Sequence, residues 1–126
     1  MVIGIGTDLM EIARIAQSID RYGERFLQRI FTPGEIAYCR RKQKNAAESF
    51  AARFAAKEAG AKALGTGISR GVGWLELEVA REPGGRPLLT LRGRAAERAA
   101  ALGVHRISLS LTHSRDCALA VVVMEG

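Results

Sequence analysis

Residues 50–67 place four charged side chains in an alanine-rich segment. On a helix with 3.6 residues per turn, Arg53 and Lys57 flank the apolar face on one side, and Glu58 and Lys62 flank it on the other. Glu58 and Lys62, four residues apart, are typical of a solvent-exposed ion pair. The small alanines also leave room for a bulky ligand, and this charge pattern suits phosphate groups. Both interpretations stay open at this point.

Asp8 is a second candidate for chemistry, because it follows the apolar run 2–7, which ends in Gly-Ile-Gly-Thr. A dinucleotide-binding loop is excluded, since Leu9 stands where the third glycine of that motif belongs. The run predicts a strand that delivers the Asp8 carboxylate to its C-terminal end, next to the start of a helix. There the carboxylate serves either as a helix cap or as a metal or catalytic group.

A third polar cluster surrounds His113, between two expected strands. Its serine and threonine neighbours are also ordinary turn formers. A Ser-His-Asp hydrolase is disfavoured, because the chain has no nucleophile-elbow pattern. The segment 65–67, Gly-Thr-Gly, lacks the order of a P-loop and predicts a helix stop. Cys39 and Cys117 lack metal-site spacing and are expected to be reduced.

The elements that must position these residues follow from periodicity and from turn and capping residues. Thr32 and Glu35 form a capping-box pattern with Pro33 at the first helical position, and Asn45 with Glu48 gives a second capping pattern. The expected fold is α+β, a mainly antiparallel sheet packed against a long central helix and shorter helices, in one domain over residues 1–126. Helices are expected over 9–19, 24–30, 33–42, 45–64 and 94–102, and strands over 2–7, 74–80, 87–91, 107–112 and 117–123.

Composition narrows the classes of partner. The formal charge is +6 with a pI near 10.0, which favours nucleic acid, phosphorylated cofactors or an acidic protein. No segment reaches the roughly 18 apolar residues that a membrane helix needs, so no membrane association is expected. Acidic residues interrupt the apolar N-terminus, which therefore predicts a buried strand of a cytoplasmic protein.

Taken together, four segments resemble the holo-acyl-carrier-protein synthase family of 4′-phosphopantetheinyl transferases in order and spacing. The resemblance runs through nearly the whole chain, and the block Arg53 to Ala63 paired with Gly-x-Gly-x-Asp8 is its most specific part. One departure is Thr112, where the family is expected to have serine. The matching segments are GIGTDLMEIAR at 4–14, FAARFAAKEAGAKALGTG at 50–67, GRP at 85–87 and SLTHSRDCALAVV at 110–122.

The resemblance implies transfer of 4′-phosphopantetheine from coenzyme A to a serine of apo acyl carrier protein, releasing 3′,5′-ADP, in fatty acid biosynthesis. It implies that Asp8 and Glu58 bind Mg²⁺, an ion that takes one or two carboxylates and fills its shell with phosphate oxygens and water. Lys62 would neutralise the pyrophosphate. Three groups are candidates for the general base: Glu58, Asp8 through a metal-bound water, and Glu35, with Glu58 preferred.

The same resemblance implies further binding residues. Arg53, Lys57 and His113 are candidates to hold coenzyme A phosphates, and the segment Gly65, Thr66 and Gly67 to line the pocket for its nucleotide end. Arg14, Arg21 and Arg25 are expected to dock the acidic acyl carrier protein, although a solvated face would look the same. The resemblance also implies a homotrimer with active sites between subunits.

A small basic nucleic-acid-binding module is the alternative, because of the high pI. Aromatic residues make up only 6% of the chain, however, and no basic strand carries a stacking pair. Such a module also has no use for Asp8 and Glu58 beside a basic cluster. The sequence therefore favours a transferase with no nucleic-acid partner.

Overall fold

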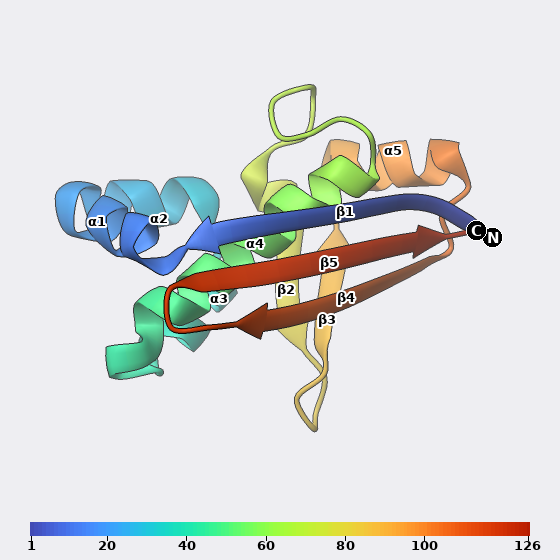
Figure 1. Cartoon of the computed structure of the whole chain (residues 1–126). Coiled ribbons are helices and arrows are strands. Elements are labelled where there is room, and N and C mark those ends of the chain that lie inside the picture. Colours follow the sequence, from blue (N-terminus) through green and yellow to red (C-terminus); the bar gives the residue numbers. More distant parts are fainter.

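A computed structural model describes all 126 residues, with both termini side by side at one end (Figure 1). The predicted α+β class is confirmed, and all strand pairing is antiparallel. No helix is both long and apolar enough to span a membrane. In chain order the elements are β1 (Val2–Glu11), α1 (Ile12–Tyr22), α2 (Glu24–Ile30), α3 (Pro33–Arg40), η1 (Gln43–Asn45), α4 (Ala46–Ala63), η2 (Trp74–Glu76), β2 (Leu77–Arg81), β3 (Pro87–Leu91), α5 (Gly93–Leu102), β4 (Arg106–His113) and β5 (Cys117–Glu125).

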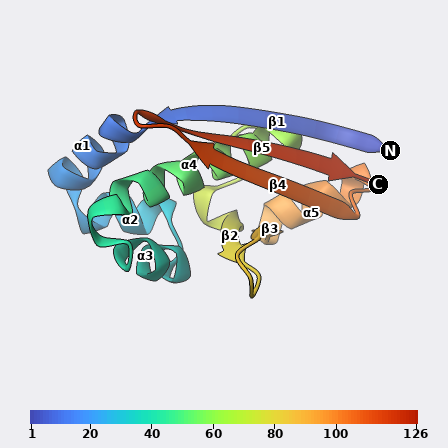
Figure 2. The ribbon, with the colours of Figure 1, turned by 60° about the horizontal axis from the view of Figure 1, so that its bottom comes forward.

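The main sheet has three strands in the order β1-β5-β4, and a separate hairpin pairs β2 with β3. The long helix α4 lies across one face of the main sheet, with the β2-β3 hairpin beyond it (Figure 2). Helices α1, α2 and α3 gather around the first half of α4, while α5 lies near its second half. Two buried apolar clusters result, and residues of α4 belong to both of them.

The first strand is longer than the sequence predicted. Residues 2–7 were expected to form it, with a helix from Leu9, but β1 continues to Glu11 and pairs with β5 down to Cys117. The ladder with β5 satisfies backbone groups that a helix start at Leu9 would have to satisfy locally. Asp8 therefore lies inside a strand, opposite Ala120, and the helix-cap interpretation of its carboxylate is wrong.

Two glycines let β1 approach α4 closely. A Cβ atom on Gly4 would lie 2.0 Å from the Ala63 carbonyl oxygen, and one on Gly6 would lie 1.8 Å from that of Ala59. No other residue fits at either position without moving one backbone away from the other. Because alternate residues of a strand share a face, Asp8 lies on this same α4-facing side.

The two capping patterns behave differently. The Thr32 hydroxyl accepts from the Glu35 N–H and the Glu35 carboxylate accepts from the Thr32 N–H, so the first capping box is confirmed. Asn45 does precede α4, but its side chain makes no capping hydrogen bond, so the second pattern is wrong. The carboxylate of Glu48 instead lies 3.2 Å from Nε2 of His113.

Candidate active site

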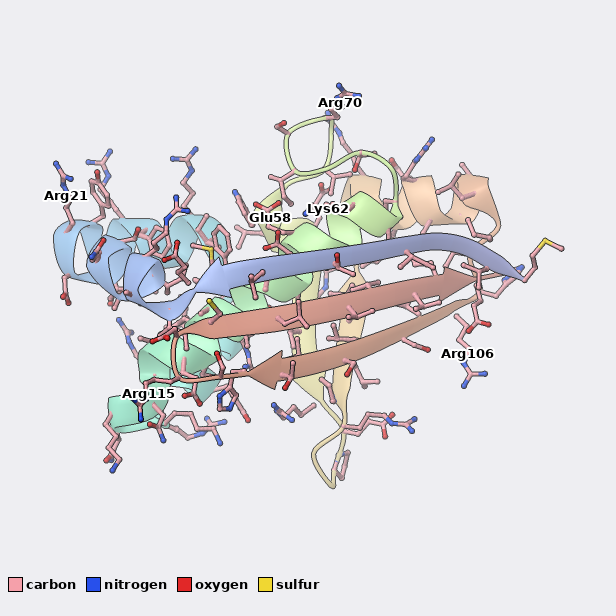
Figure 3. The ribbon with its side chains drawn as sticks, viewed as in Figure 1. Arg21, Glu58, Lys62, Arg70, Arg106 and Arg115 are labelled. Atoms are coloured by element: carbon pink, nitrogen blue, oxygen red, sulfur yellow. The ribbon has the colours of Figure 1, made fainter.

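Asp8, Glu58 and Lys62 form one cluster at the β1 edge of the main sheet, and Figure 3 shows Glu58 and Lys62 projecting beside that strand. Lys62 Nζ lies 3.2 Å from Asp8 Oδ1 and also donates to the Thr7 carbonyl at 3.0 Å. The isolated Glu58–Lys62 ion pair is not formed, because Lys62 pairs with Asp8 instead. The Asp8 side chain is 17% exposed and that of Lys62 is 51% exposed, so ligands can reach the cluster from outside.

The two carboxylates of this cluster repel each other. Partial burial raises the pKa of Glu58, the negative charge of Asp8 raises it further, and the charge of Lys62 opposes both. A divalent cation would relieve this repulsion. No group of three or more acidic, histidine or cysteine side chains surrounds the site. The donor set therefore fits Mg²⁺, which completes its shell with water and phosphate oxygens, better than an ion that needs a full protein cage.

A second site lies at the opposite, β4 edge of the sheet. Arg53 and His113, both predicted from the sequence as phosphate ligands, line one cavity of about 390 Å³. Arg53 is only 2% exposed, and its Nε atom has no hydrogen-bond partner. A buried guanidinium with an unused donor beside a cavity is suited to an anionic ligand.

Sequence reasoning missed three residues of this β4-edge cavity: Tyr38, Lys42 and Arg81. The Arg53 guanidinium lies 4.0 Å from the centre of the Tyr38 ring, and Lys42 Nζ lies 4.9 Å from it. Burial alone would raise the pKa of the Tyr38 hydroxyl, but a hydrogen bond to Lys42 and the charges of Arg81 and Arg53 outweigh burial and lower it. No spacing along the sequence predicts this group of side chains, because Tyr38, Arg53 and Arg81 come from the separate elements α3, α4 and β2.

Lys57 does not belong to either site, which corrects its prediction as a phosphate ligand. Its side chain is fully buried, and its ammonium contacts Glu35 Oε1 at 2.8 Å. It also donates to the carbonyls of Trp74 at 3.0 Å and Leu77 at 2.6 Å. All three donors are therefore used inside the protein.

Glu35 is excluded as a general base by the same network. Its side chain is fully buried, and its two carboxylate oxygens accept from Lys57, from the Thr32 N–H and from the Val79 N–H at 2.7 Å. These contacts leave it with no access to a substrate hydroxyl. Of the three candidate bases, Glu58 and Asp8 remain.

The predicted docking arginines divide between two places. Arg14 and Arg21 line one pocket of about 340 Å³, whereas Arg25 lies outside it on α2 and is exposed. Phe54 contributes to this pocket one helical turn before Glu58, so the pocket adjoins the carboxylate cluster. Its other lining residues are Met10, Ile15, Gln17, Ser18, Tyr22 and Phe26.

The segment Gly65, Thr66 and Gly67 ends α4, as predicted. Both glycines have positive φ, 81° and 65°, and the N–H groups of Thr66 and Gly67 donate back to the Ala61 carbonyl. The segment therefore begins one turn beyond Lys62, near the carboxylate cluster and away from the cavity that holds Arg53.

Comparison with known proteins finds relatives along the whole chain. Holo-[acyl-carrier-protein] synthase of Koribacter versatilis is 55% identical over 125 residues, which is 99% of both chains, and that of Solibacter usitatus is 54% identical over the whole of both. The crystal structure of the synthase from Neisseria meningitidis matches with a TM-score of 0.90 at 36% identity, covering both chains completely.

The Helicobacter pylori synthase, solved in complex with coenzyme A, matches with a TM-score of 0.84 at 36% identity, covering 96% of this chain and 99% of that one. Nothing in these likenesses supports the nucleic-acid-binding alternative. A family model described as the 4′-phosphopantetheinyl transferase superfamily matches residues 4–122. The chain belongs to the 4′-phosphopantetheinyl transferase superfamily.

Proposed function

We propose that this protein is a holo-acyl-carrier-protein synthase, which transfers 4′-phosphopantetheine from coenzyme A to a serine of apo acyl carrier protein in fatty acid biosynthesis. The observation that carries the proposal is the convergence of Asp8, Glu58 and Lys62 at the β1 edge, in a chain 55% identical to the synthase of Koribacter versatilis. Two carboxylates and one ammonium suit phosphoryl transfer, which depends mainly on positioning and charge neutralisation.

Asp8 and Glu58 hold Mg²⁺ in this proposal, and the ion supplies charge neutralisation on the coenzyme A pyrophosphate. The ammonium of Lys62, already 3.2 Å from Asp8, faces the same phosphates. The serine oxygen forms a bond to the β-phosphorus, the bond from that phosphorus to the bridging oxygen breaks, and 3′,5′-ADP leaves. Glu58 accepts the serine proton, because Glu35 is buried and paired with Lys57, whereas Glu58 lies in the carboxylate cluster that ligands can reach.

The phosphates of coenzyme A bind at different sites. The pyrophosphate lies at Lys62, and the segment Gly65 to Gly67 lines the pocket for the nucleotide end, while Arg53 and His113 bind the phosphate on the ribose. On α4, Arg53 and Glu58 are five residues apart and so point about 140° away from each other. The main sheet separates their sites by two strand spacings, roughly 10 Å. One protomer therefore presents the two groups at opposite edges of its sheet.

A ring of protomers resolves this separation, because the β4 edge of one copy then meets the β1 edge of the next. A twofold dimer formed edge to edge joins identical edges and leaves each site incomplete, whereas a head-to-tail ring completes every site. The outer face of the sheet supports such an assembly, since Ile5 and Leu9 are 60% and 62% exposed there. A homotrimer is the smallest such ring.

Mixing two inactive variants tests the shared site. Glu58→Gln removes the carboxylate from one edge, and Arg53→Ala removes the guanidinium from the other. Trimers that contain both variants restore some interfaces with two intact halves, so the mixture should regain activity that neither variant has alone. Glu58→Gln mixed with Asp8→Asn is the matched control, because both changes damage the same half. Equal inactivity of both mixtures would place the whole site within one protomer.

The acidic carrier protein docks on the pocket that contains Arg14 and Arg21. Its rim is basic and its interior includes Phe26 and Phe54, so it fits a helix that presents carboxylates around one apolar side chain. Arg25, on the exposed face of α2, extends the basic rim. Docking there brings the partner within one helical turn of Glu58.

The test of the function is intact-mass analysis of an apo acyl carrier protein incubated with this protein, coenzyme A and Mg²⁺. The carrier should gain one phosphopantetheine, and EDTA should abolish the gain. Glu58→Gln should reduce Mg²⁺-dependent turnover at least a hundredfold while leaving the fold intact, because the swap keeps the shape and removes the charge. No gain with any of several acidic apo carrier proteins would contradict the proposal.

A further inference from the structure

The loop of residues 65–73 between α4 and η2 carries one charged side chain, Arg70. Figure 3 shows Arg70 projecting from the far end of this loop, on the same edge of the molecule as Glu58 and Lys62. Arg21 projects to that edge from α1, on the other side of the carboxylate cluster. The loop contains no aspartate or glutamate, and no salt bridge involves Arg70. Its charge is therefore free to meet a partner.

This loop is fixed at both ends. At its start, Arg98 Nε donates to the Leu64 carbonyl at 3.1 Å. At its end, the Glu76 carboxylate accepts from the Gly73 N–H at 2.8 Å and from the Arg94 N–H at the start of α5 at 2.6 Å. These contacts hold the loop in one position relative to α4 and α5.

The tip of the loop is a strained turn. The Ser69 N–H donates to the Val72 carbonyl at 3.1 Å, which closes the turn around Arg70. Ser69 has a φ of 101°, a backbone conformation that residues with a side chain rarely adopt. Strain of this kind concentrates at binding and catalytic sites, where the surrounding structure maintains it. The strained turn is an observation independent of charge, and it points to the same residue.

We infer that Arg70 is a second docking contact for the acidic partner, on the side of Glu58 and Lys62 opposite Arg21. The inference rests on the proposed transferase function and adds to it a partner with carboxylates on both sides of its reacting hydroxyl. Glu58 lies between Arg21 and Arg70 along this edge, so a partner that contacts both arginines brings its hydroxyl to Glu58 (Figure 3). Charges at the rim of such an interface act on association and partner choice more than on the chemical step.

Steady-state kinetics with the full-length protein test this inference, with the carrier protein and coenzyme A varied separately. Arg70→Ala should raise the KM for carrier protein roughly 1.5-fold to fivefold, as loss of one exposed interfacial charge pair does, with kcat and the KM for coenzyme A unchanged. Arg70→Glu should raise it further, because it places like charges together. The difference from the unmodified protein should shrink at about 1 M salt, where charges are screened beyond about 3 Å.

Arg106→Ala is the matched control, because Arg106 is also exposed but projects from the other end of the sheet (Figure 3). Its KM for carrier protein should stay unchanged. In the Arg21→Ala, Arg70→Ala double variant, the two fold-changes in the KM for carrier protein should multiply, since the two contacts lie on separate flanks. A raised KM for coenzyme A would instead make Arg70 a phosphate ligand, and no change in either KM would confine docking to α1. Either result overturns the inference while transfer by the unmodified protein still supports the function.

Discussion

Replacing Lys57 by methionine should destabilise the protein severely. The substitution keeps most of the aliphatic volume but removes the ammonium that contacts Glu35 Oε1 and the carbonyls of Trp74 and Leu77. It leaves a buried carboxylate without its cation and removes one donor from each carbonyl, although the Trp74 carbonyl still accepts from the Leu77 N–H. Breaking one partner of a buried ion pair costs about 3–5 kcal/mol. The free energy of unfolding of most single domains is only about 5–15 kcal/mol, so the substitution should remove much of it.

The assay is urea-induced unfolding at fixed protomer concentration, because an oligomer's stability depends on concentration. A cycle of Lys57→Met, Glu35→Gln and the double variant isolates the pair. The double variant should cost about 2 kcal/mol less than the sum of the single variants, since the uncompensated charges disappear together. Lys44→Met, at an exposed position of η1, is the control and should change stability by less than about 0.5 kcal/mol.

Two results would refute this reasoning. A cost below about 1 kcal/mol for Lys57→Met, with no coupling to Glu35, would mean that the buried pair is not formed in solution. A well-folded Lys57→Met protein with a raised KM for coenzyme A would mean that Lys57 faces the substrate after all. Burial lowers the pKa of Lys57 while the charge of Glu35 opposes this effect, so loss of Glu35 would favour the neutral amine.

Two further predictions concern other buried contacts. Gly6→Ala should lower the free energy of unfolding by about 3 kcal/mol and abolish transfer, because its Cβ would lie 1.8 Å from a carbonyl oxygen of α4. The control in thermal unfolding is Gly34→Ala, whose Cβ meets nothing closer than 3.5 Å. Glu78 has a lowered pKa because the Thr32 hydroxyl and Arg92 hydrogen-bond its carboxylate, so its stabilising contribution is present above about pH 4.5 and is lost as pH falls through the lowered pKa. The stability difference between the native protein and Glu78→Gln, measured by urea unfolding from pH 7 to pH 3, should therefore shrink on acidification, and a constant difference would contradict this.

The resemblance predicted that Asp8 and Glu58 act together, whereas the residues alone left the role of each open. The positions of Glu58 and Lys62 on α4 are local properties, so helical spacing predicted them correctly. The length of β1 was wrong, because its last residues extend through hydrogen bonds to β5, more than a hundred residues away. Local strand propensity does not reveal a partner strand that is so distant in the sequence.

The cavity at the β4 edge shows the same limit more strongly. Arg53 and His113 were predicted from the family resemblance, whereas Tyr38 and Arg81 come from α3 and β2 and meet Arg53 only in the folded chain. Helical spacing also placed Lys57 on the same flank as Arg53, and it could not distinguish an exposed flank from a buried one. Burial of a lysine follows from what packs against the helix, here η2 and β2.

The buried Lys57–Glu35 pair can fix the rotation of α4, and this helix carries residues of both sites. A rotation of this helix by one residue, about 100°, would remove both Glu58 from the β1 edge and Arg53 from the β4 edge. Buried ion pairs often contribute little net stability, and in some proteins they fix one arrangement of the chain. We therefore expect the Lys57→Met, Glu35→Gln double variant to lose more in kcat than its stability explains, measured at a temperature where it stays folded. A normal kcat would show that packing against Gly4 and Gly6 alone fixes the rotation of α4.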